Sequence, residues 1–331
     1  MHDRGEGEFM TEPAILLRGV VKDFGELRAV SELDLEVPRG SIYGLLGPNG
    51  SGKTTTIRMI MGILEPDQGS ISLFGGDPNR SRRAKVGYLP EERGLYRRMK
   101  VLEQLIFLAR LRGIPRALAR ERSEHWLARL GLDDRAEKRV EDLSKGMQQK
   151  VQFIGTVLHE PELLILDEPF SGLDPINQDV LESIVWEFQE RGATILFSTH
   201  LMEQAERMCE SVCLISGSKK VLDGDLRELK RAERMGVVVV DFEGGQDWVA
   251  GPGVEDFDET PTGVRIRLLD DADPQPILER ALRAGIRIGR FEVAQPRLHE
   301  IFVKHAGAPA DTPPEGLRRN QELEVASEGR P

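Results

Sequence analysis

Residues 47–55 carry side chains and glycines suited to binding phosphate and a metal ion. They read GPNGSGKTT and match the pattern G-x-x-x-x-G-K-[ST]. In such a loop the glycines let backbone N–H groups curl around phosphates, the lysine reaches the β- and γ-phosphates, and the next hydroxyl binds Mg²⁺. Lys53 and Thr54 should lie at the centre of a nucleoside triphosphate site. The other loop residues predicted to bind are Gly47, Pro48, Asn49, Gly50, Ser51, Gly52 and Thr55.

A strand-like run that ends in two acidic residues supplies the second half of such a site. Residues 163–169 read LLILDEP. Open α/β sheets bind ligands at the carboxyl ends of their strands, so both carboxylates should lie beside the loop. Asp167 is expected to hold Mg²⁺, directly or through water, and Glu168 to orient or deprotonate the attacking water. Without the loop, this Asp-Glu pair would read more simply as a solvated strand end.

A second candidate phosphate site lies at the start of a predicted helix. Residues 140–161 read VEDLSKGMQQKVQFIGTVLHEP, in which Ser144 is placed to cap the helix after a polar turn. Free N–H groups at a helix start, together with a small hydroxyl, suit a phosphate. The sequence therefore predicts two phosphate-binding features, and the presence of both in one chain needs an explanation.

The elements that must position these residues alternate between residues 15 and 225. Continuous apolar runs of strand length at 41–47, 163–169 and 193–199 are separated by helical stretches. Such runs are typical of parallel strands covered on both faces, so the predicted fold class is α/β. Between about residues 92 and 160 the strand signal gives way to helical periodicity, which indicates a helical subdomain.

The composition changes after residue 225. A helix at 226–236, strand-like runs at 237–245, 264–269 and 287–293, and a helix at 276–286 predict a small C-terminal α+β domain. The final residues are rich in Pro, Gly and charge, which is typical of disorder. The predicted organisation is a flexible N-terminus, a nucleotide-binding domain, the α+β domain and a disordered tail, at 1–12, 13–225, 226–306 and 307–331.

Bulk composition narrows the classes of partner. The chain has 331 residues, 39% hydrophobic and 31% charged, with a net charge of −11. The net negative charge disfavours a nucleic acid partner, which requires a coherent basic patch.

No run of eighteen or more apolar residues marks a membrane-spanning helix. Cys209 and Cys213 have no further Cys or His close by in the sequence, so we expect two buried thiols rather than a zinc cluster.

The order of the motifs resembles the nucleotide-binding subunit of an ABC transporter. GPNGSGKTT resembles the Walker A motif, LLILDEP the Walker B motif, LSKGMQQ (143–149) the signature, SGLD (171–174) the D-loop and STH (198–200) the switch histidine. The resemblance implies an ATPase that uses ATP and Mg²⁺, with Phe24 stacked on adenine and His200 at the γ-phosphate. Without the other motifs, Phe24 would be interpreted as an aromatic side chain packed against its neighbours. His200 would be interpreted as a hydrogen-bonded histidine at the end of a strand.

The same resemblance accounts for two phosphate-binding features in one chain. In this family two cassettes meet head to tail, and the signature helix of one completes the nucleotide site of the other. It implies that a second ABC ATPase subunit, most simply a second copy of this chain, binds the other side of the ATP. Asp174 would then lie at the seam between the subunits. The residues expected to face the ATP held by the second copy are Ser144, Lys145, Gly146 and Met147.

Three positions depart from the family pattern. Lys145 and Met147 replace a glycine and the glutamine of the usual LSGGQ signature. Glu91, in the stretch GYLPEERGLY (87–96), stands where the family has the Q-loop glutamine. An oxygen of Glu91 can still bind Mg²⁺, although the side chain adds a negative charge near the γ-phosphate. The alternative for Glu91 and its neighbour Glu92 is a solvated acidic turn.

LPEERGLY and the segment 281–307 resemble the ATPase subunits of ABC-2-type exporters, including sodium-efflux and drug-resistance types. This resemblance implies a cytoplasmic subunit on the inner face of the membrane that drives a separate integral-membrane permease. The C-terminal domain then reads either as a stabilising appendage or as a regulatory, dimer-supporting one.

The rival is a soluble ABC-type ATPase acting on ribosomes or DNA. Members that act on ribosomes usually carry two cassettes, and members that act on DNA usually carry long coiled coils. The net negative charge of this chain counts against binding to either ribosomes or DNA. A phosphate-loop kinase or GTPase would not explain LSKGM or STH.

Overall fold

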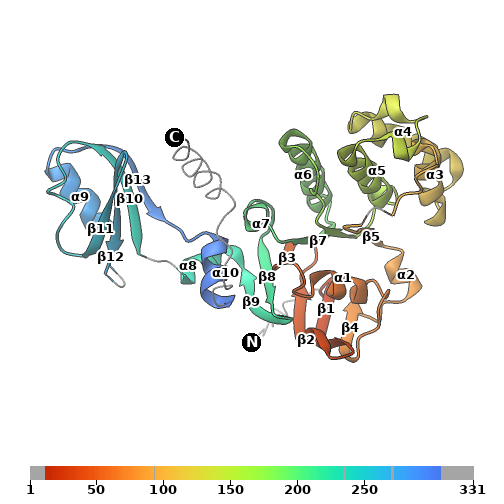
Figure 1. The fold of residues 1–331 in the computed structure, drawn as a ribbon, viewed down its shortest axis with the longest axis horizontal. Helices are drawn as coiled ribbons and strands as arrows, with labels where there is room; N and C mark the ends of the chain where they lie inside the picture. Colours follow the sequence, from red (N-terminus) through yellow and green to blue (C-terminus); the bar gives the residue numbers. More distant parts are fainter. Residues whose placement is uncertain (1–11, 93, 234–235, 270–271, 307–331) are drawn as a thin grey trace, which may run out of the picture.

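The computed structural model describes residues 12–92, 94–233, 236–269 and 272–306. A six-stranded sheet in the order β5-β6-β7-β3-β8-β9 runs through its larger part (Figure 1). The first five strands are parallel, and β9 is antiparallel to β8. Their bounds are β3 Ile42–Leu46, β5 Val86–Leu89, β6 Leu163–Asp167, β7 Thr194–Thr199, β8 Ser211–Ser216 and β9 Lys219–Asp225.

Both faces of this sheet are covered. On β3, Ile42 and Leu46 point into the core under the helices, whereas Tyr43 and Leu45 point into a second core on the opposite face. Successive side chains of a strand alternate between faces, so a strand buried on both sides needs an unbroken apolar run. The strands predicted at 41–47, 163–169 and 193–199 are confirmed as β3, β6 and β7.

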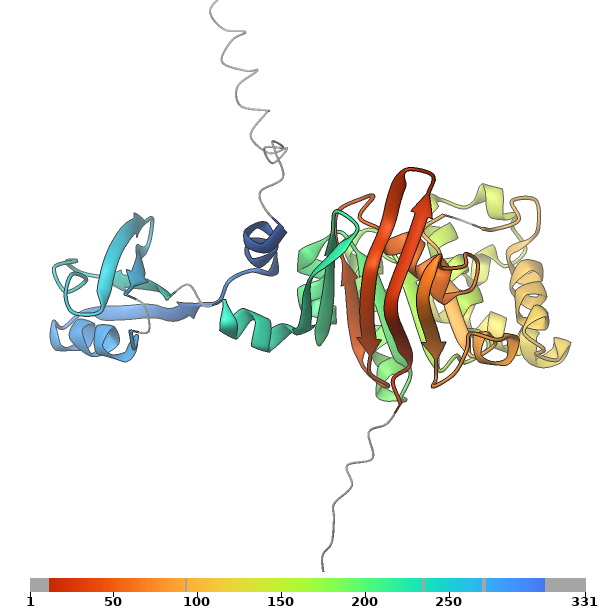
Figure 2. The same cartoon turned by 90° about the horizontal axis from the view of Figure 1, so that it is seen from below.

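A separate antiparallel sheet in the order β2-β1-β4 packs with α1 against the second core (Figure 2). The first half of its strand β2 is tied to the β8–β9 turn, because Ser31 N–H donates to Ser218 O at 2.8 Å and Ser218 Oγ donates to Arg28 O at 2.7 Å. The bounds are β1 Ile15–Phe24, β2 Leu27–Val37, β4 Gln68–Leu73 and α1 Lys53–Ile60.

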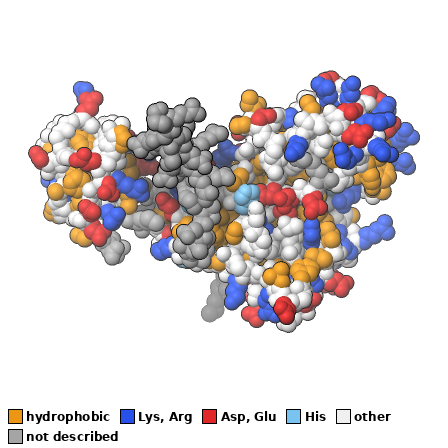
Figure 3. Space-filling view, viewed as in Figure 1, with side chains coloured by type: hydrophobic (Ala, Val, Ile, Leu, Met, Phe, Trp, Pro, Cys, Tyr) orange, Lys and Arg blue, Asp and Glu red, His pale blue; other side chains and the backbone are white. Residues whose placement is uncertain are grey.

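Helices α3 to α7 cover the other face, and α3, α4 and α5 form a group at one end of the molecule with many Lys and Arg side chains on its outer surface (Figures 1 and 3). The Trp126 ring of this group stacks on Phe188 of α6, with centroids 6.1 Å apart. Ser144 caps α5 by accepting from Met147 N–H, which confirms the predicted helix start. The bounds are α2 Arg80–Arg83, α3 Val101–Leu111, α4 Arg116–Arg129, α5 Lys145–Val157, α6 Pro175–Glu190 and α7 Met202–Met208.

The C-terminal residues contribute to two cores. A four-stranded antiparallel sheet in the order β11-β12-β10-β13 packs against α9 around a core of its own (Figure 1). In contrast, Leu298 and Phe302 of α10 and Leu226 of α8 belong to the main core. The bounds are α8 Leu226–Ala232, β10 Val237–Glu243, β11 Val254–Thr260, β12 Gly263–Leu268, α9 Gln275–Arg283, β13 Arg287–Ala294 and α10 Leu298–Ala306.

Three further observations bear on the predicted organisation. The helix predicted at 276–286 is found as α9. The flexible N-terminus predicted for residues 1–12, apart from Glu12, and the tail predicted for 307–331 lie outside the described residues. Within the described parts of the chain, no helix has the length and apolar character needed to cross a membrane. The domain limits remain predictions.

Candidate functional site

The predicted phosphate-binding loop (residues 47–55, the phosphate loop below) connects β3 in the interior of the six-stranded sheet to α1 and includes the first residues of that helix. Two of its glycines are required by close backbone contacts. Gly47 has φ +152°, and a Cβ there would lie 2.1 Å from Ile215 O. Gly52 has φ +110°, and a Cβ there would lie 2.4 Å from Ala29 O. Any other residue would clash at these positions, so the loop's shape depends on both glycines.

Lys53 lies inside the loop and is 6% exposed. Its Nζ donates to Gly47 O at 2.7 Å and to Pro48 O at 3.1 Å. Burial lowers the pKa of Lys53, and the nearby carboxylates oppose that shift. The Ser51 hydroxyl is also buried, and it has no hydrogen-bond partner among the described residues. A buried cation beside an unpaired hydroxyl in a glycine-rich loop fits a bound phosphate.

The walls of the same cavity carry oxygen ligands suited to a magnesium ion. Thr54 Oγ1 donates to Asp167 Oδ2 at 3.1 Å, while the buried Asp167 Oδ1 has no partner among the described residues. Burial raises the pKa of Asp167; the neighbouring hydroxyls of Ser198 and Thr54 oppose that rise, and the charges of Glu91 and Glu168 add to it. No cluster of three or more His, Cys, Asp or Glu in the described ranges could hold a metal alone. This donor set fits Mg²⁺, which usually shares its coordination between one or two carboxylates, water and substrate phosphates.

The burial of the Asp167 carboxylate leads to a stability prediction. An incompletely hydrogen-bonded buried group costs roughly 1–3 kcal/mol and more when it is charged, and asparagine removes that charge at nearly the same size. We therefore expect Asp167→Asn to melt at a higher temperature than wild type at neutral pH without nucleotide, by about 2–4 °C per kcal/mol. The same variant should lose magnesium-dependent hydrolysis.

The difference in melting temperature between Asp167→Asn and wild type should depend on pH, and calorimetry can measure it. The folded-state pKa of Asp167 lies above its unfolded value, so wild-type stability falls as the pH rises from the ordinary to the raised pKa. The advantage of Asp167→Asn should therefore be absent below about pH 4 and complete above the raised pKa. A variant that melts at or below the wild-type temperature at neutral pH would contradict this role for burial.

Glu168 is held by three contacts at the end of β6. Its Oε1 accepts from His200 N–H at 2.9 Å and lies 2.6 Å from His200 Nδ1, and its Oε2 accepts from Thr199 Oγ1 at 3.1 Å. Its φ is +48°, a costly conformation for a residue with a side chain, and such strain is frequent at active sites. Thr199 was not identified from sequence, and its only signal is its position beside His200.

The cavity has a volume of about 530 Å³ and an apolar rim. Phe24 ends β1 and Leu27 begins β2, and both are exposed, at 47% and 67%. Lys22 Nζ lies 5.7 Å from the Phe24 ring centroid. The structure thus brings Glu91, Asp167, Glu168 and Phe24 together with the loop residues Asn49, Gly50, Gly52, Lys53, Thr54 and Thr55, whereas Gly47, Pro48 and Ser51 do not line the cavity. It adds Leu27, Arg28, Ala29 and Ser218 to the lining.

The signature residues do not line this cavity within one chain. Ser144 and Lys145 are exposed, whereas Gly146 packs closely enough that a Cβ would lie 3.3 Å from Gly172 O. Helix α5, which begins at this turn, also contacts the loops beside the cavity. Gln149 Nε2 donates to Pro169 O at 2.9 Å, and Gln152 Nε2 donates to Pro90 O at 3.0 Å. α5 therefore links the exposed signature turn to the residues flanking Glu168 and Glu91.

Asp174 also lies away from the cavity, at the start of α6. It caps this helix by accepting from Asn177 N–H at 3.0 Å, and hydrogen bonds from Asn177 lower its pKa. Asp174 is exposed, so a seam between subunits is compatible with its position.

Relatives of known family match most of the chain. An uncharacterized ABC transporter ATP-binding protein of Bacillus subtilis, YhaQ, is 45% identical over 290 residues, covering 87% of this chain and 97% of that protein. This chain belongs to the ABC transporter ATP-binding family. The ABC transporter family model matches residues 30–171, and the DrrA1-3-like C-terminal domain model matches residues 224–306.

Other members of the ABC family match over a similar length. The daunorubicin/doxorubicin resistance ATP-binding protein DrrA of Streptomyces peucetius is 32% identical and covers 91% of this chain and 95% of its own. The Nod factor export ATP-binding protein I of Cupriavidus pinatubonensis is 34% identical, covering 92% and 97%. A solved ATP binding subunit of an ABC transporter superposes with a TM-score of 0.62 at 32% identity, covering 66% of this chain and 92% of that one.

Proposed function

We propose that this chain hydrolyses Mg-ATP and drives export through a separate membrane permease. One observation carries the proposal: Lys53, Thr54, Asp167 and Glu168 line one cavity, and His200 contacts Glu168 directly. The names of the relatives from Streptomyces and Cupriavidus, which refer to drug resistance and to export, support an exporter subunit.

Each residue of the site has a distinct role in this proposal. The loop N–H groups and Lys53 bind the phosphates, and Phe24 with Leu27 offers an apolar surface to the adenine. Thr54 and Asp167 would hold Mg²⁺, with Glu91 as a further oxygen ligand, and the ion would neutralise charge on the phosphates. Glu168 orients the attacking water and accepts its proton, and His200 fixes that carboxylate and contacts the γ-phosphate.

Two copies of the chain sandwich the nucleotide in this proposal. The exposed Ser144 hydroxyl and the first N–H groups of α5 are available to a phosphate outside their own chain. Lys145, Gly146 and Met147 lie in the same turn, and exposed Asp174 would meet the second copy at the seam. ATP then holds the dimer together, and hydrolysis releases it.

The permease contact is proposed on the helical group beside Glu91. The Tyr96 and Phe107 rings lie edge to face with centroids 5.8 Å apart, and both are exposed, at 54% and 38%. The Glu91 loop, held by Gln152 of α5, connects this surface to the nucleotide cavity. The chain would thereby lie on the inner face of the cell membrane through its permease.

Purification from detergent extracts of the native host tests this function. Tagged wild-type chain should co-purify with a membrane protein that has several spanning helices, as identified by mass spectrometry. Phe107→Glu should lose that protein, whereas Leu282→Glu, which changes an exposed leucine of α9, should retain it. Recovery of ribosomes or DNA in place of a membrane protein would favour the soluble ATPase and contradict the proposal.

A further inference from the structure

The helix that follows His200 borders the residues that hold Glu168. α7 begins two residues after His200, whose Nδ1 lies 2.6 Å from Glu168 Oε1. Gln204 of α7 reaches the same carboxylate indirectly, because its side-chain oxygen lies 3.3 Å from the Thr199 hydroxyl that donates to Glu168. A displacement of α7 would therefore disturb both side-chain partners of Glu168.

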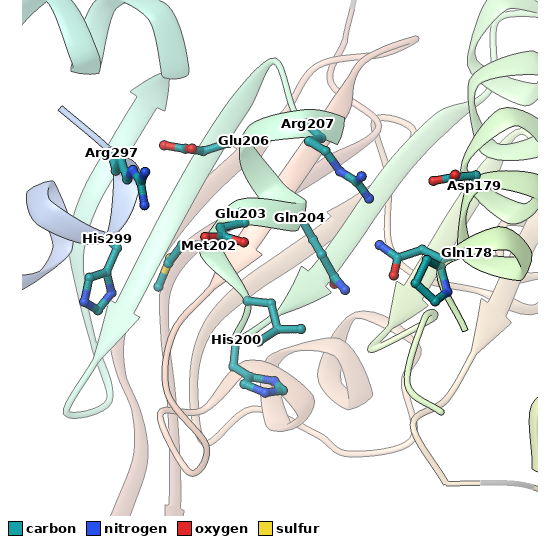
Figure 4. A pocket seen from close by; sticks show the side chains of 12 residues that line it. Gln178, Asp179, His200, Met202, Glu203, Gln204, Glu206, Arg207, Arg297 and His299 are labelled. Atoms are coloured by element: carbon teal, nitrogen blue, oxygen red, sulfur yellow. The ribbon is translucent and has the colours of Figure 1, made fainter. Parts of the chain in front are cut away.

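α7 is incompletely packed on the side that faces α6. A cavity of about 560 Å³ lies there, lined by the start of α6, by α7 and by the residues at the start of α10 (Figure 4). Across it, Arg207 forms an ion pair with Glu182 of α6. Figure 4 shows the side chains of Arg207 and Glu206 directed to opposite sides, toward α6 and toward the C-terminal segment respectively. Close packing from α6 therefore does not fix α7 along this cavity.

Glu206 attaches α7 to the C-terminal segment. Its Oε1 accepts from the backbone N–H of Leu298, the first residue of α10, and lies 3.0 Å from Lys230 Nζ of α8. The side chains of Glu206 and Lys230 are each only 20% exposed, so this pair is less screened than a surface ion pair. A carboxylate at a helix N-terminus is also favoured by the free N–H groups and the helix dipole.

Apolar contacts continue the same attachment. Leu298 and Phe302 of α10 lie in one buried cluster with Met202 and Ala205 of α7. At the far end of α10, Lys304 Nζ and His305 Nε2 each lie 2.6 Å from the carboxylate of Glu233, just after α8. The two C-terminal helices are thus joined to each other as well as to α7.

We propose that Glu206 is a positioning residue through which α8 and α10 hold α7, and with it His200 and Glu168, in the arrangement that hydrolyses ATP. This inference rests on the proposed function, because it needs Glu168 to act on the attacking water. The C-terminal segment then sets the turnover rate of the ATPase while leaving the phosphate loop untouched.

The test compares Glu206→Ala with Glu203→Ala in the full-length chain. Glu203 is exposed on the same helix, and its carboxylate has no partner among the described residues. Loss of the charge-assisted contacts of Glu206 should lower kcat by about tenfold, while KM for ATP stays within about twofold because Lys53 is unaffected. Glu203→Ala should match wild type. A kcat for Glu206→Ala equal to that of Glu203→Ala would overturn the inference.

Hydrogen exchange supplies a readout that does not depend on activity. In Glu206→Ala, the amides of α7 and of Leu298 should exchange faster than in wild type, and in Glu203→Ala they should not. If Glu206→Ala does not fold, Glu206→Gln keeps the shape without the charge and should lower kcat by about threefold. Unchanged exchange or an unchanged kcat in the variant that folds would overturn the inference.

A parallel assay of Glu168→Gln separates this inference from the function on which it rests. If Glu168→Gln is inactive and Glu206→Ala turns over like wild type, only the positioning role fails. If Glu168→Gln hydrolyses ATP at the wild-type rate, the proposed catalytic function itself fails.

Discussion

Glu168→Gln is expected to slow ATP hydrolysis by roughly 10²–10⁴-fold, the usual contribution of a general base. The amide oxygen can still accept from His200 N–H in place of Oε1. The amide nitrogen in place of Oε2 can donate to Thr199 Oγ1, whose own hydrogen can turn to Gln204 Oε1, so the site keeps its shape. It cannot take a proton from water at neutral pH. ATP should therefore stay bound, because the phosphate loop and Asp167 are unchanged.

The same variant should accumulate as a dimer. If ATP holds two copies together, blocking hydrolysis keeps them together, so Glu168→Gln with Mg-ATP should elute as a dimer in size-exclusion chromatography. Wild type should elute mostly as a monomer. Glu162→Gln is the matched control, since Glu162 is an exposed glutamate just before the same strand, paired with Lys85 at 2.8 Å. This control should hydrolyse ATP and elute like wild type.

Two outcomes would contradict the role of Glu168. A variant that turns over within a few-fold of wild type would show that another group activates the water. A variant that binds ATP, does not hydrolyse it and stays monomeric at high protein concentration would contradict ATP-driven dimerisation.

Lys53→Ala is expected to weaken Mg-ATP binding by about 100-fold or more. Hydrogen bonds to a charged group contribute roughly 1.5–3 kcal/mol each, and this side chain should make them to two phosphates. The substitution also removes the donor to Gly47 O and Pro48 O, so the loop should lose part of its preformed shape. Titration with a fluorescent ATP analogue measures the effect.

Lys85→Ala is the control for the loss of one positive charge. Lys85 is exposed and precedes β5 of the same sheet, where it pairs with Glu162. Its replacement should leave the dissociation constant for ATP unchanged. If Lys53→Ala folds and binds ATP as tightly as Lys85→Ala does, the phosphate-loop assignment is wrong.

The parts of the site that could be predicted from sequence are those set by short-range patterns. Buried parallel strands need apolar residues at every position, so β3 and β6 were visible as unbroken runs. The carboxyl ends of parallel strands share one edge of a sheet, which is why Thr54 and Asp167 meet at 3.1 Å although 113 residues separate them. The Ser144 cap was likewise a local signal.

Other features depend on long-range pairing that no local pattern encodes. The strands β1, β2 and β4 form a sheet of their own, whose half-exposed residues resemble those of any surface strand. Leu27 and Ser218 meet at the cavity because the start of β2 is hydrogen-bonded to the β8–β9 turn, which lies about 190 residues away in sequence. The contact from Leu298 to Glu206 spans 92 residues, and periodicity within α10 does not reveal which helix it packs against.

The central claim is that the nucleotide lies between Lys53 of one copy and the turn at Ser144 of the other. The most direct measurement is a structure of the Glu168→Gln dimer with Mg-ATP. The account predicts Ser144 Oγ and the first N–H groups of α5 within hydrogen-bonding distance, about 2.7–3.2 Å, of γ-phosphate oxygens held by the second copy. A dimer in which this turn faces solvent, away from either nucleotide, would contradict the account.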